Sequence, residues 1–195
     1  KDTHESILKV LNQAKYLSPV YQVVIANPPY LTSSSMNPRL SKWLGDNYKL
    51  SKADLFSAFI ERNFNLAKPS CYVAMITMQS WMFLPSFEKL RLSFLNKNRL
   101  VNLTHIGTGG FDSIGGQVVA TTAFVIENKF SPEAKGDFIR VTSEKGEKNK
   151  SRLFLTSQLD AKNENRFRVS MDDFNKVPGM PIAYWISNSL RDTFD

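Results

Sequence analysis

The sequence contains few of the residues that build disulfide frameworks and metal centres. Among its 195 residues there is one cysteine, Cys71, so neither an internal disulfide nor a cysteine-based zinc site can form. The two histidines, His4 and His105, lie far apart in the chain and lack the spacing of metal ligands. A single thiol suits a reducing compartment, and we therefore predict a cytoplasmic protein that binds no metal.

Long hydrophobic runs are also missing. No apolar stretch approaches the roughly 18 residues that a membrane-spanning helix requires, and the first residues show no signal-peptide pattern. Internal repeats and low-complexity tracts are absent too, whereas the 42% of hydrophobic residues, with 14 Phe, indicates a globular core. The net charge of +7 is a modest indication of a polyanionic partner, although a basic soluble surface would look the same.

Both ends of the sequence have an unusual composition for a complete chain. The first residue is Lys1, and the closing stretch, PGMPIAYWISNSLRDTFD, is apolar and rich in aromatic residues, with no obvious stop. We expect the chain to be a segment of a longer polypeptide.

The hydrophobic pattern alternates between helical and strand periodicities. We predict four strands and three helices, with a polar stretch of little periodicity at 31–52 that we interpret as a long functional or mobile loop. This order predicts an α/β fold with a mostly parallel, doubly wound sheet and an antiparallel final pair of strands at an edge. The predicted helices are 4–17, 53–69 and 85–98, and the predicted strands are 21–26, 71–78, 100–107 and 116–129.

The composition changes near residues 128–135. From Lys129 to Arg168 there are ten Lys or Arg against six Asp or Glu, which is typical of a solvated face or of a surface that tracks DNA phosphates. Within this stretch Arg166 and Arg168, in the sequence RFRV, are the candidate DNA-binding residues. We therefore divide the chain into residues 1–130 and residues 131–195.

The sequence VVIANPPY, residues 23–30, combines a buried-looking strand with a stiff loop. Pro28 and Pro29 cannot donate to a strand ladder, and each disfavours helical backbone in the preceding residue. Ligands bind at the carboxyl ends of strands in open α/β sheets, so this loop fixes Asn27 and Tyr30 where a ligand would lie. A tight connection or a polyproline ligand segment is the alternative.

An amide oxygen, a free carbonyl and an aromatic ring on one stiff loop suit the binding of a planar amine. The exocyclic amine of a nucleobase is a poor nucleophile because its lone pair is delocalised into the ring. The side-chain oxygen of Asn27 and the carbonyl of Pro28 can each accept one amine hydrogen, and Tyr30 can stack on the ring. Such a base is out of reach inside a duplex and has to be flipped into the site.

This strand and loop, ANPPY, resemble motif IV of the amino-group DNA methyltransferases, and the final Tyr is the form that prefers adenine. Residues 53–95 look like the motif V helix, the motif VI strand and the following helix of those enzymes, and residues 111–129 look like their motif VIII strand pair. The resemblance covers nearly all 195 residues. It is strongest to the PglX-type adenine-specific methyltransferases of bacterial BREX phage-exclusion systems, above all in MNPRLSKWLGDNY, AMITMQSWMFLPSFEKLR and IGGQVVATTAFV.

The resemblance implies which residues bind the target base. Asn27 and Pro28 correspond to the residues that hold the amine, Tyr30 to the ring that stacks on adenine, and Pro29 completes the catalytic loop. The aromatic residue at the start of motif VIII packs against the base from another side, and here that residue is Phe111, after the glycine-rich GTGG.

The resemblance also implies the cofactor S-adenosylmethionine. Phe59 and Asp54, in the motif V helix, are the candidate cofactor-binding residues, although Phe59 fits the core equally well and Asp54 a helix start. The glycine-rich loop and the two acidic residues that hold this cofactor in the family have no counterpart before residue 20. We therefore expect the C-terminal half of a Rossmann-like methyltransferase domain, followed by the start of a DNA target-recognition region.

These observations imply a segment of a site-specific enzyme that transfers a methyl group to the N6 amine of a flipped adenine in double-stranded DNA, in BREX or restriction-modification systems. The isolated segment is expected to be inactive, and other BREX proteins are candidate partners. A non-catalytic module that binds DNA or a partner is one alternative. A protein glutamine-amide methyltransferase, which uses a similar Asn-Pro-Pro-Tyr loop, is another, and the basic charge favours DNA over it.

Overall fold

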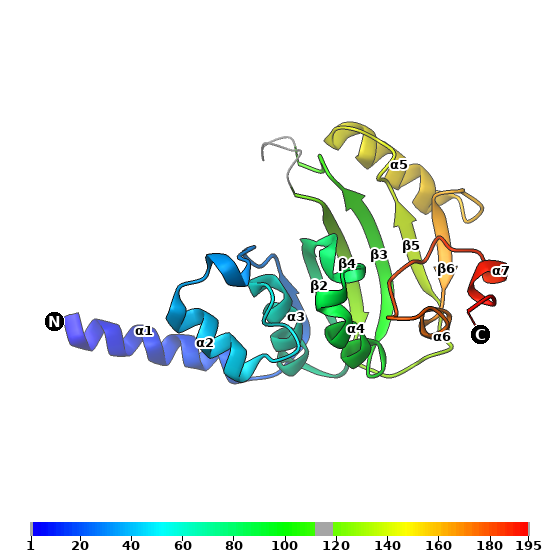
Figure 1. The fold of residues 1–195 in the computed structure, drawn as a ribbon. Coiled ribbons are helices and arrows are strands. Elements are labelled where there is room, and N and C mark those ends of the chain that lie inside the picture. The colour runs from blue at the N-terminus through cyan, green and yellow to red at the C-terminus, as the bar shows by residue number, and fades with distance from the viewer. Residues whose placement is uncertain (1, 112–118, 195) are drawn as a thin grey trace.

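The computed structural model describes residues 2–111 and 119–194, and the strands in these residues form one mixed sheet (Figure 1). β1 and β2 are parallel, as are β3 and β5, while β4 is antiparallel to both β2 and β3, and β6 is antiparallel to β5. The strand order across the sheet is β1-β2-β4-β3-β5-β6. The strands are β1 (Tyr21–Ala26), β2 (Ala67–Met78), β3 (Arg99–Gly107), β4 (Thr121–Glu127), β5 (Gly136–Arg140) and β6 (Arg166–Val169).

This architecture confirms the predicted α/β class and the antiparallel pairing of β3 with β4. The predicted edge position of β4 is wrong, because Phe124 pairs with Met75 of β2 on one side and with Leu103 of β3 on the other. The physical reason lies in the apolar run of β4, which is typical of a strand with neighbours on both sides. The described antiparallel strand at an edge is β6.

The polar stretch after β1 contains a helix that we did not predict. The short 3₁₀ turn η1 (Ser33–Ser35) is followed by α2 (Pro38–Asn47). The side chain of Asn37 accepts a hydrogen bond from the amide of Leu40 at 2.9 Å, and Pro38 occupies the first helical position. Asn followed by Pro is a helix-start signal. Within α2, however, Leu44 is the one buried residue, so the apolar periodicity of this helix is weak.

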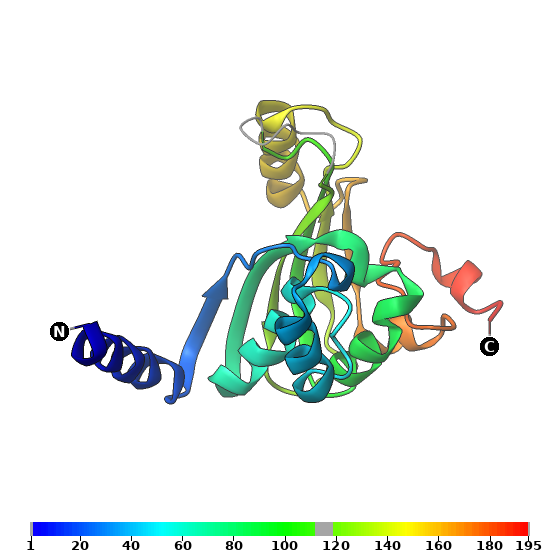
Figure 2. The ribbon, with the colours of Figure 1, turned by 60° about the vertical axis from the view of Figure 1, so that its left-hand side comes forward.

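One face of the sheet carries the hydrophobic core. Four elements and the C-terminal residues 180–185 cover this face, where Phe56, Trp81 and Phe124 are fully buried (Figures 1 and 2). The rings of Trp81 and Phe124 meet edge to face, with centroids 5.0 Å apart. The four elements are α3 (Leu55–Leu66), η2 (Gln79–Met82), η3 (Pro85–Phe87) and α4 (Glu88–Leu95).

The opposite face is open over β1. Val23 and Ile25 point to this face and are 54% and 78% exposed, whereas α5 (Glu147–Leu159) packs against β5 at the other side of the sheet. α1 (Asp2–Leu17), at the predicted position, projects away from the sheet beside β1 (Figure 2). Its apolar side chains, among them Ile7 and Leu11, are exposed.

The sheet and its core continue through the predicted division at residue 130. β5 and β6 extend the sheet, and the ring of Phe138 in β5 stacks on Tyr184 at a centroid distance of 5.2 Å. Two short helices follow, α6 (Met171–Asn175) and α7 (Asn188–Arg191). Residues 131–194 therefore share one core with the preceding strands. The predicted target-recognition region would thus begin within the same sheet as the NPPY loop.

Candidate active site

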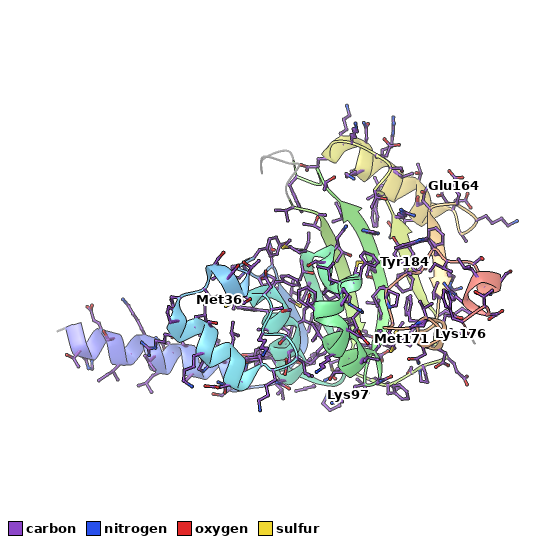
Figure 3. All side chains as sticks on the ribbon, viewed as in Figure 1. Met36, Lys97, Glu164, Met171, Lys176 and Tyr184 are labelled. Carbon is purple, nitrogen blue, oxygen red and sulfur yellow. The ribbon has the colours of Figure 1, made fainter. Side chains whose placement is uncertain are left out.

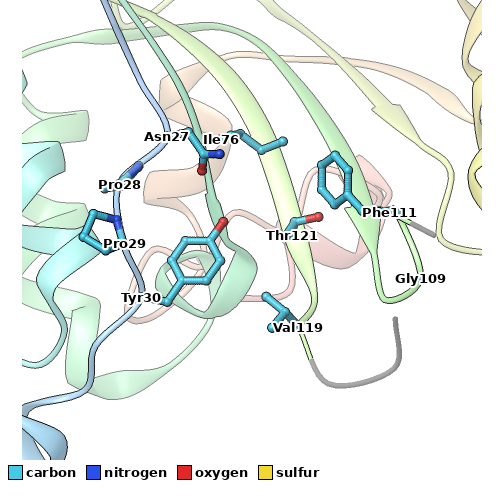
Figure 4. Close-up of a pocket in the computed structure, with 10 residues that line it drawn as sticks. Asn27, Pro28, Pro29, Tyr30, Ile76, Gly109, Phe111, Val119 and Thr121 are labelled. Atoms are coloured by element: carbon cyan, nitrogen blue, oxygen red, sulfur yellow. The ribbon is translucent and has the colours of Figure 1, made fainter. Parts of the chain in front are cut away.

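A cavity of about 520 Å³ lies beyond the carboxyl ends of β1 and β3 (Figure 4). Its lining brings together the predicted base-binding residues, which are separated by about eighty residues in the sequence. We call residues 27–30 the NPPY wall and residues 107–111 the glycine turn. The residues that line the cavity are Asn27, Pro28, Pro29, Tyr30, Ile76, Gly109, Gly110, Phe111, Val119 and Thr121.

The NPPY wall is anchored by a buried proline and presents polar groups to the cavity. Pro28 is buried and Tyr30 half-buried, while Asn27 is exposed to the cavity, and Figure 4 shows its amide and the Tyr30 hydroxyl on the cavity side. The ring of Tyr30 packs edge-on against Phe56 of α3, with centroids 6.0 Å apart. Burial raises the pKa of the Tyr30 hydroxyl, so Tyr30 stays a neutral ring at physiological pH.

Asp54 braces the segment that follows Tyr30. Its Oδ1 atom accepts hydrogen bonds from the amide of Leu31 at 3.0 Å and from the amide of Phe56 at 3.2 Å. The amide of Leu55 in turn donates to the carbonyl of Leu31 at 2.9 Å. Asp54 therefore caps α3 and ties the NPPY wall to the start of this helix. These contacts support the helix-start alternative, and its proposed cofactor role stays a prediction.

The glycine turn carries Phe111 to the other side of the cavity. Gly107 and Gly109 have φ angles of +72° and +65°, a backbone region that side chains disfavour. A Cβ on Gly110 would lie 2.4 Å from Cγ2 of Ile106, so the turn can fold back onto β3 only because this position is glycine. The glycine-rich turn predicted before Phe111 is thus present, and it brings Phe111 to the cavity.

The start of β4 completes this side of the cavity. The amide of Gln79, the first residue of η2, donates to the carbonyl of Ala120 at 2.9 Å and so fixes the residues that flank Ala120, Val119 and Thr121. Thr121 is 3% exposed, and its hydroxyl has no hydrogen-bond partner among the described residues. The remaining residues of the predicted motif VIII strand, 112–118, lie outside the described residues.

Phe59 lies apart from this cavity. It is on α3 and 37% exposed, while Phe56 on the same helix is fully buried in the core. Neither side chain lines the cavity. Its predicted contact with the cofactor stays a prediction.

The predicted DNA-binding arginines lie in β6, at the opposite edge of the sheet from the NPPY wall. Arg166 forms a two-pronged ion pair with Asp137 of β5, at 2.8 and 2.6 Å, and this hydrogen bonding lowers the pKa of the Asp137 carboxyl. Arg168 is exposed. The structure therefore separates the two: Arg166 joins β5 to β6, and Arg168 presents its charge to solvent.

Sequence reasoning missed a buried histidine near the site. The ring nitrogens of His105 lie 2.9 Å from the Tyr184 hydroxyl and 2.7 Å from Oε1 of Gln79, and Tyr184 reaches the sheet from the C-terminal segment (Figure 3). Burial, with the nearby charges of Arg140 and Lys150, lowers the pKa of His105 to about 4. The signal available in the sequence was the inward position of His105 in a strand that alternates between buried and exposed residues.

Two absences apply to the described residues. Residues 2–111 and 119–194 contain no cluster of three or more His, Cys, Asp or Glu side chains suited to a metal ion. No helix in this part of the chain combines the length and the apolar character needed to cross a membrane.

Comparison with known proteins finds relatives that are adenine-specific methyltransferases. The adenine-specific methyltransferase PglX of Lacticaseibacillus casei (strain Zhang) is 39% identical over 178 residues, which cover 91% of this chain and 15% of that protein. BrxX of Escherichia coli O9:H4 (strain HS), also an adenine-specific methyltransferase, is 35% identical over 195 residues, covering 100% of this chain and 16% of that protein. The chain thus spans 15–16% of the length of these curated relatives.

A solved structure shares the fold of this chain, and a family model shows its family. The methyltransferase subunit of a type I restriction-modification system from Streptococcus thermophilus shares the fold, with a TM-score of 0.57 and 12% identity over 86% of this chain and 38% of that one. The model of the Eco57I restriction-modification methylase matches residues 4–111, more than half of the chain. This match includes the NPPY wall, α3, β2, β3 and the glycine turn, and it shows that the chain belongs to the Eco57I restriction-modification methylase family.

Proposed function

We propose that this chain is the base-binding part of an enzyme that methylates the N6 amine of adenine in double-stranded DNA. The observation that carries the proposal is the cavity that joins the NPPY wall to Phe111. An opening of about 520 Å³ has room for one flipped base between two aromatic side chains. The names of the two curated relatives, both adenine-specific methyltransferases, support the same substrate.

The residues of this chain would orient and activate the amine. Two acceptors, the side-chain oxygen of Asn27 and the carbonyl of Pro28, take one amine hydrogen each and draw the nitrogen toward tetrahedral geometry, which exposes its lone pair. The ring of Tyr30 stacks on the base, and Phe111 packs from the opposite side of the cavity.

S-adenosylmethionine would supply the methyl group. Asp54 and Phe59 remain its candidate contacts in this chain, where Oδ1 of Asp54 is engaged with two backbone amides and Phe59 lies on α3 outside the base-binding cavity. We propose that the cofactor is held mainly by other parts of the full-length protein, beside the open face over β1. The cofactor takes no part in the proposed orientation of the amine.

The partners and the location follow from the same proposal. The substrate is DNA, which places the protein in the bacterial cytoplasm, and the relation to PglX and BrxX makes other phage-exclusion proteins candidate partners. Residues 131–194 would begin the target-recognition region, with Arg168 as the exposed cation on β6.

The test uses the full-length parent protein and the variant Asn27→Ala. We expect at least about a hundredfold loss of adenine methylation, because an acceptor at the reacting nitrogen is removed. Folding should be retained because Asn27 is exposed. The matched control is Asn175→Ala, an exposed asparagine on α6 that should leave the rate unchanged.

The same assay separates the alternatives. Methylated adenine in treated DNA is read by sequencing, and a variant that keeps a tenth of the wild-type rate would contradict the role of Asn27. A wild-type protein that binds DNA without methylating it would instead be a binding module. Methyl transfer to glutamine in protein but not to DNA would identify the glutamine-amide alternative.

A further inference from the structure

Lys150 of α5 is a buried lysine that has no role in the proposed orientation of the amine. It is 4% exposed, and its Nζ atom donates to the carbonyl of Ile106 at 2.7 Å and to the carbonyl of Val141 at 3.0 Å. Ile106 belongs to β3 and Val141 directly follows β5. One ammonium group therefore joins the carboxyl ends of two parallel strands to the helix that lies over them.

The strand end that Lys150 holds is the root of the glycine turn. Gly107, the next residue, already has a positive φ, and Gly110 folds back onto the side chain of Ile106. Phe111 lines the main cavity and also a second cavity of about 280 Å³, whose other side is formed by Lys150 and its neighbours on α5. The position of Phe111 thus depends on where the carbonyl of Ile106 is held.

A buried ammonium is a costly means of packing a helix. Burial lowers the pKa of Lys150, and the nearby Glu144 offsets part of this effect. An apolar side chain of similar length would fill the same space without the cost of desolvating a charge. An apolar side chain cannot bind two carbonyls at once. The two hydrogen bonds from Lys150 fix the direction of these carbonyls as well as their distance from the helix.

We propose that Lys150 is a positioning residue that sets the glycine turn so that Phe111 packs on the flipped base; this inference rests on the function proposed above. It acts through Ile106 and touches neither the base nor the cofactor. Loss of Lys150 should therefore matter only as long as Phe111 is present.

The experiment is a double-mutant cycle in the full-length protein, with Lys150→Met and Phe111→Ala alone and combined. At saturating DNA we expect Lys150→Met to slow single-turnover methyl transfer about tenfold or more, since misplaced contacts slow reactions to this extent. DNA affinity, measured by anisotropy, should change less than twofold. In the Phe111→Ala background, Lys150→Met should have no further effect on the rate. Lys148→Met, on the exposed side of the same helix, is the matched control and should match the wild type.

Rates that multiply in the double variant, or a wild-type rate in Lys150→Met, would overturn the proposal. If Lys150→Met does not fold, Lys150→Gln, which keeps a donor for one carbonyl, replaces it in the same cycle. Gly110→Ala should reproduce the loss because its Cβ would push the turn off Ile106, and a full rate in this variant would also overturn the proposal. Wild-type methylation and its loss in Asn27→Ala, measured alongside, test the proposed function separately.

Discussion

The two sides of the cavity are built in opposite ways. The NPPY wall is stiffened by two prolines and tied to α3 by Asp54, whereas the glycine turn has two positive φ angles and depends on bonds from other elements. Lys150 binds the carbonyl of Ile106, directly before this turn, and Gln79 binds the carbonyl of Ala120, at the neighbouring start of β4. The stiffness of the NPPY wall suits groups that have to hold a reacting atom in place. The glycine turn, which depends on bonds from other elements, suits the side of the cavity that has to admit a base.

Acid should act on the glycine-turn side and leave the NPPY wall in place. The pKa of folded His105 is about 4, below the ordinary value of 6.5, so its contribution to stability is fully present above pH 6.5. This contribution is lost as the pH falls from 6.5 to 4, because the unfolded chain binds the proton first. The change should reach about 3 kcal/mol in the free energy of unfolding.

Urea unfolding between pH 4 and pH 7 measures this effect. In His105→Asn the drop assigned to this residue should disappear, and an unchanged pH profile in the variant would show that other groups cause it. The charges facing His105 are Arg140 of β5 and Lys150 of α5, and both remain in the variant.

Tyr30 tests whether the NPPY wall works through its ring. Tyr30→Ala in the full-length protein should weaken base binding by about 2 kcal/mol, the typical value of stacking on an aromatic residue. Tyr30→Phe should be tolerated because it keeps the ring. Methylation rates of both variants on the same DNA provide the measurement, and equal losses would mean that the hydroxyl, not stacking, matters.

Asp54 tests whether the bracing of the NPPY wall is what keeps it stiff. Asp54→Ala removes the acceptor for two backbone amides and should cost about 1 to 2 kcal/mol of stability. Asp54→Asn keeps an acceptor oxygen and should cost less. Thermal unfolding of both, beside the control Asp46→Ala on the exposed side of α2, provides the comparison. Identical values for Asp54→Ala and the control would remove the bracing role.

Arg168 lies outside both walls and should have the smallest effect. If β6 tracks phosphates, Arg168→Ala weakens binding to every DNA sequence and reduces the salt dependence by about one unit of slope. Arg166→Ala should instead loosen β5 from β6, because its partner is Asp137. An unchanged salt slope in Arg168→Ala would assign this stretch to the solvated surface.

Local patterns in the sequence were sufficient for β1, α1 and α3, which lie where periodicity and helix-start signals predict them, whereas β2 begins at Ala67, inside the predicted helix 53–69. They failed at α2, where a capping asparagine and a proline start a helix that buries little apolar surface. They also failed for the place of β4, because strand order depends on pairing between segments far apart in the sequence. The NPPY loop could be recognised because its prolines restrict the backbone wherever they occur.

The sequence by itself determined α1, β1, α3 and the stiff loop after β1, since these depend on neighbouring residues and on fixed backbone preferences, and it carried the family resemblance. The tertiary structure alone decided that Phe111 faces Asn27 across a cavity and that Arg166 is engaged with Asp137. It also decided that Lys150 binds the carbonyl of Ile106 and that His105 lies within hydrogen-bond distance of Gln79. Each of these depends on which strands become neighbours in the sheet. Strand pairing is set by the burial of whole faces and not by any local pattern.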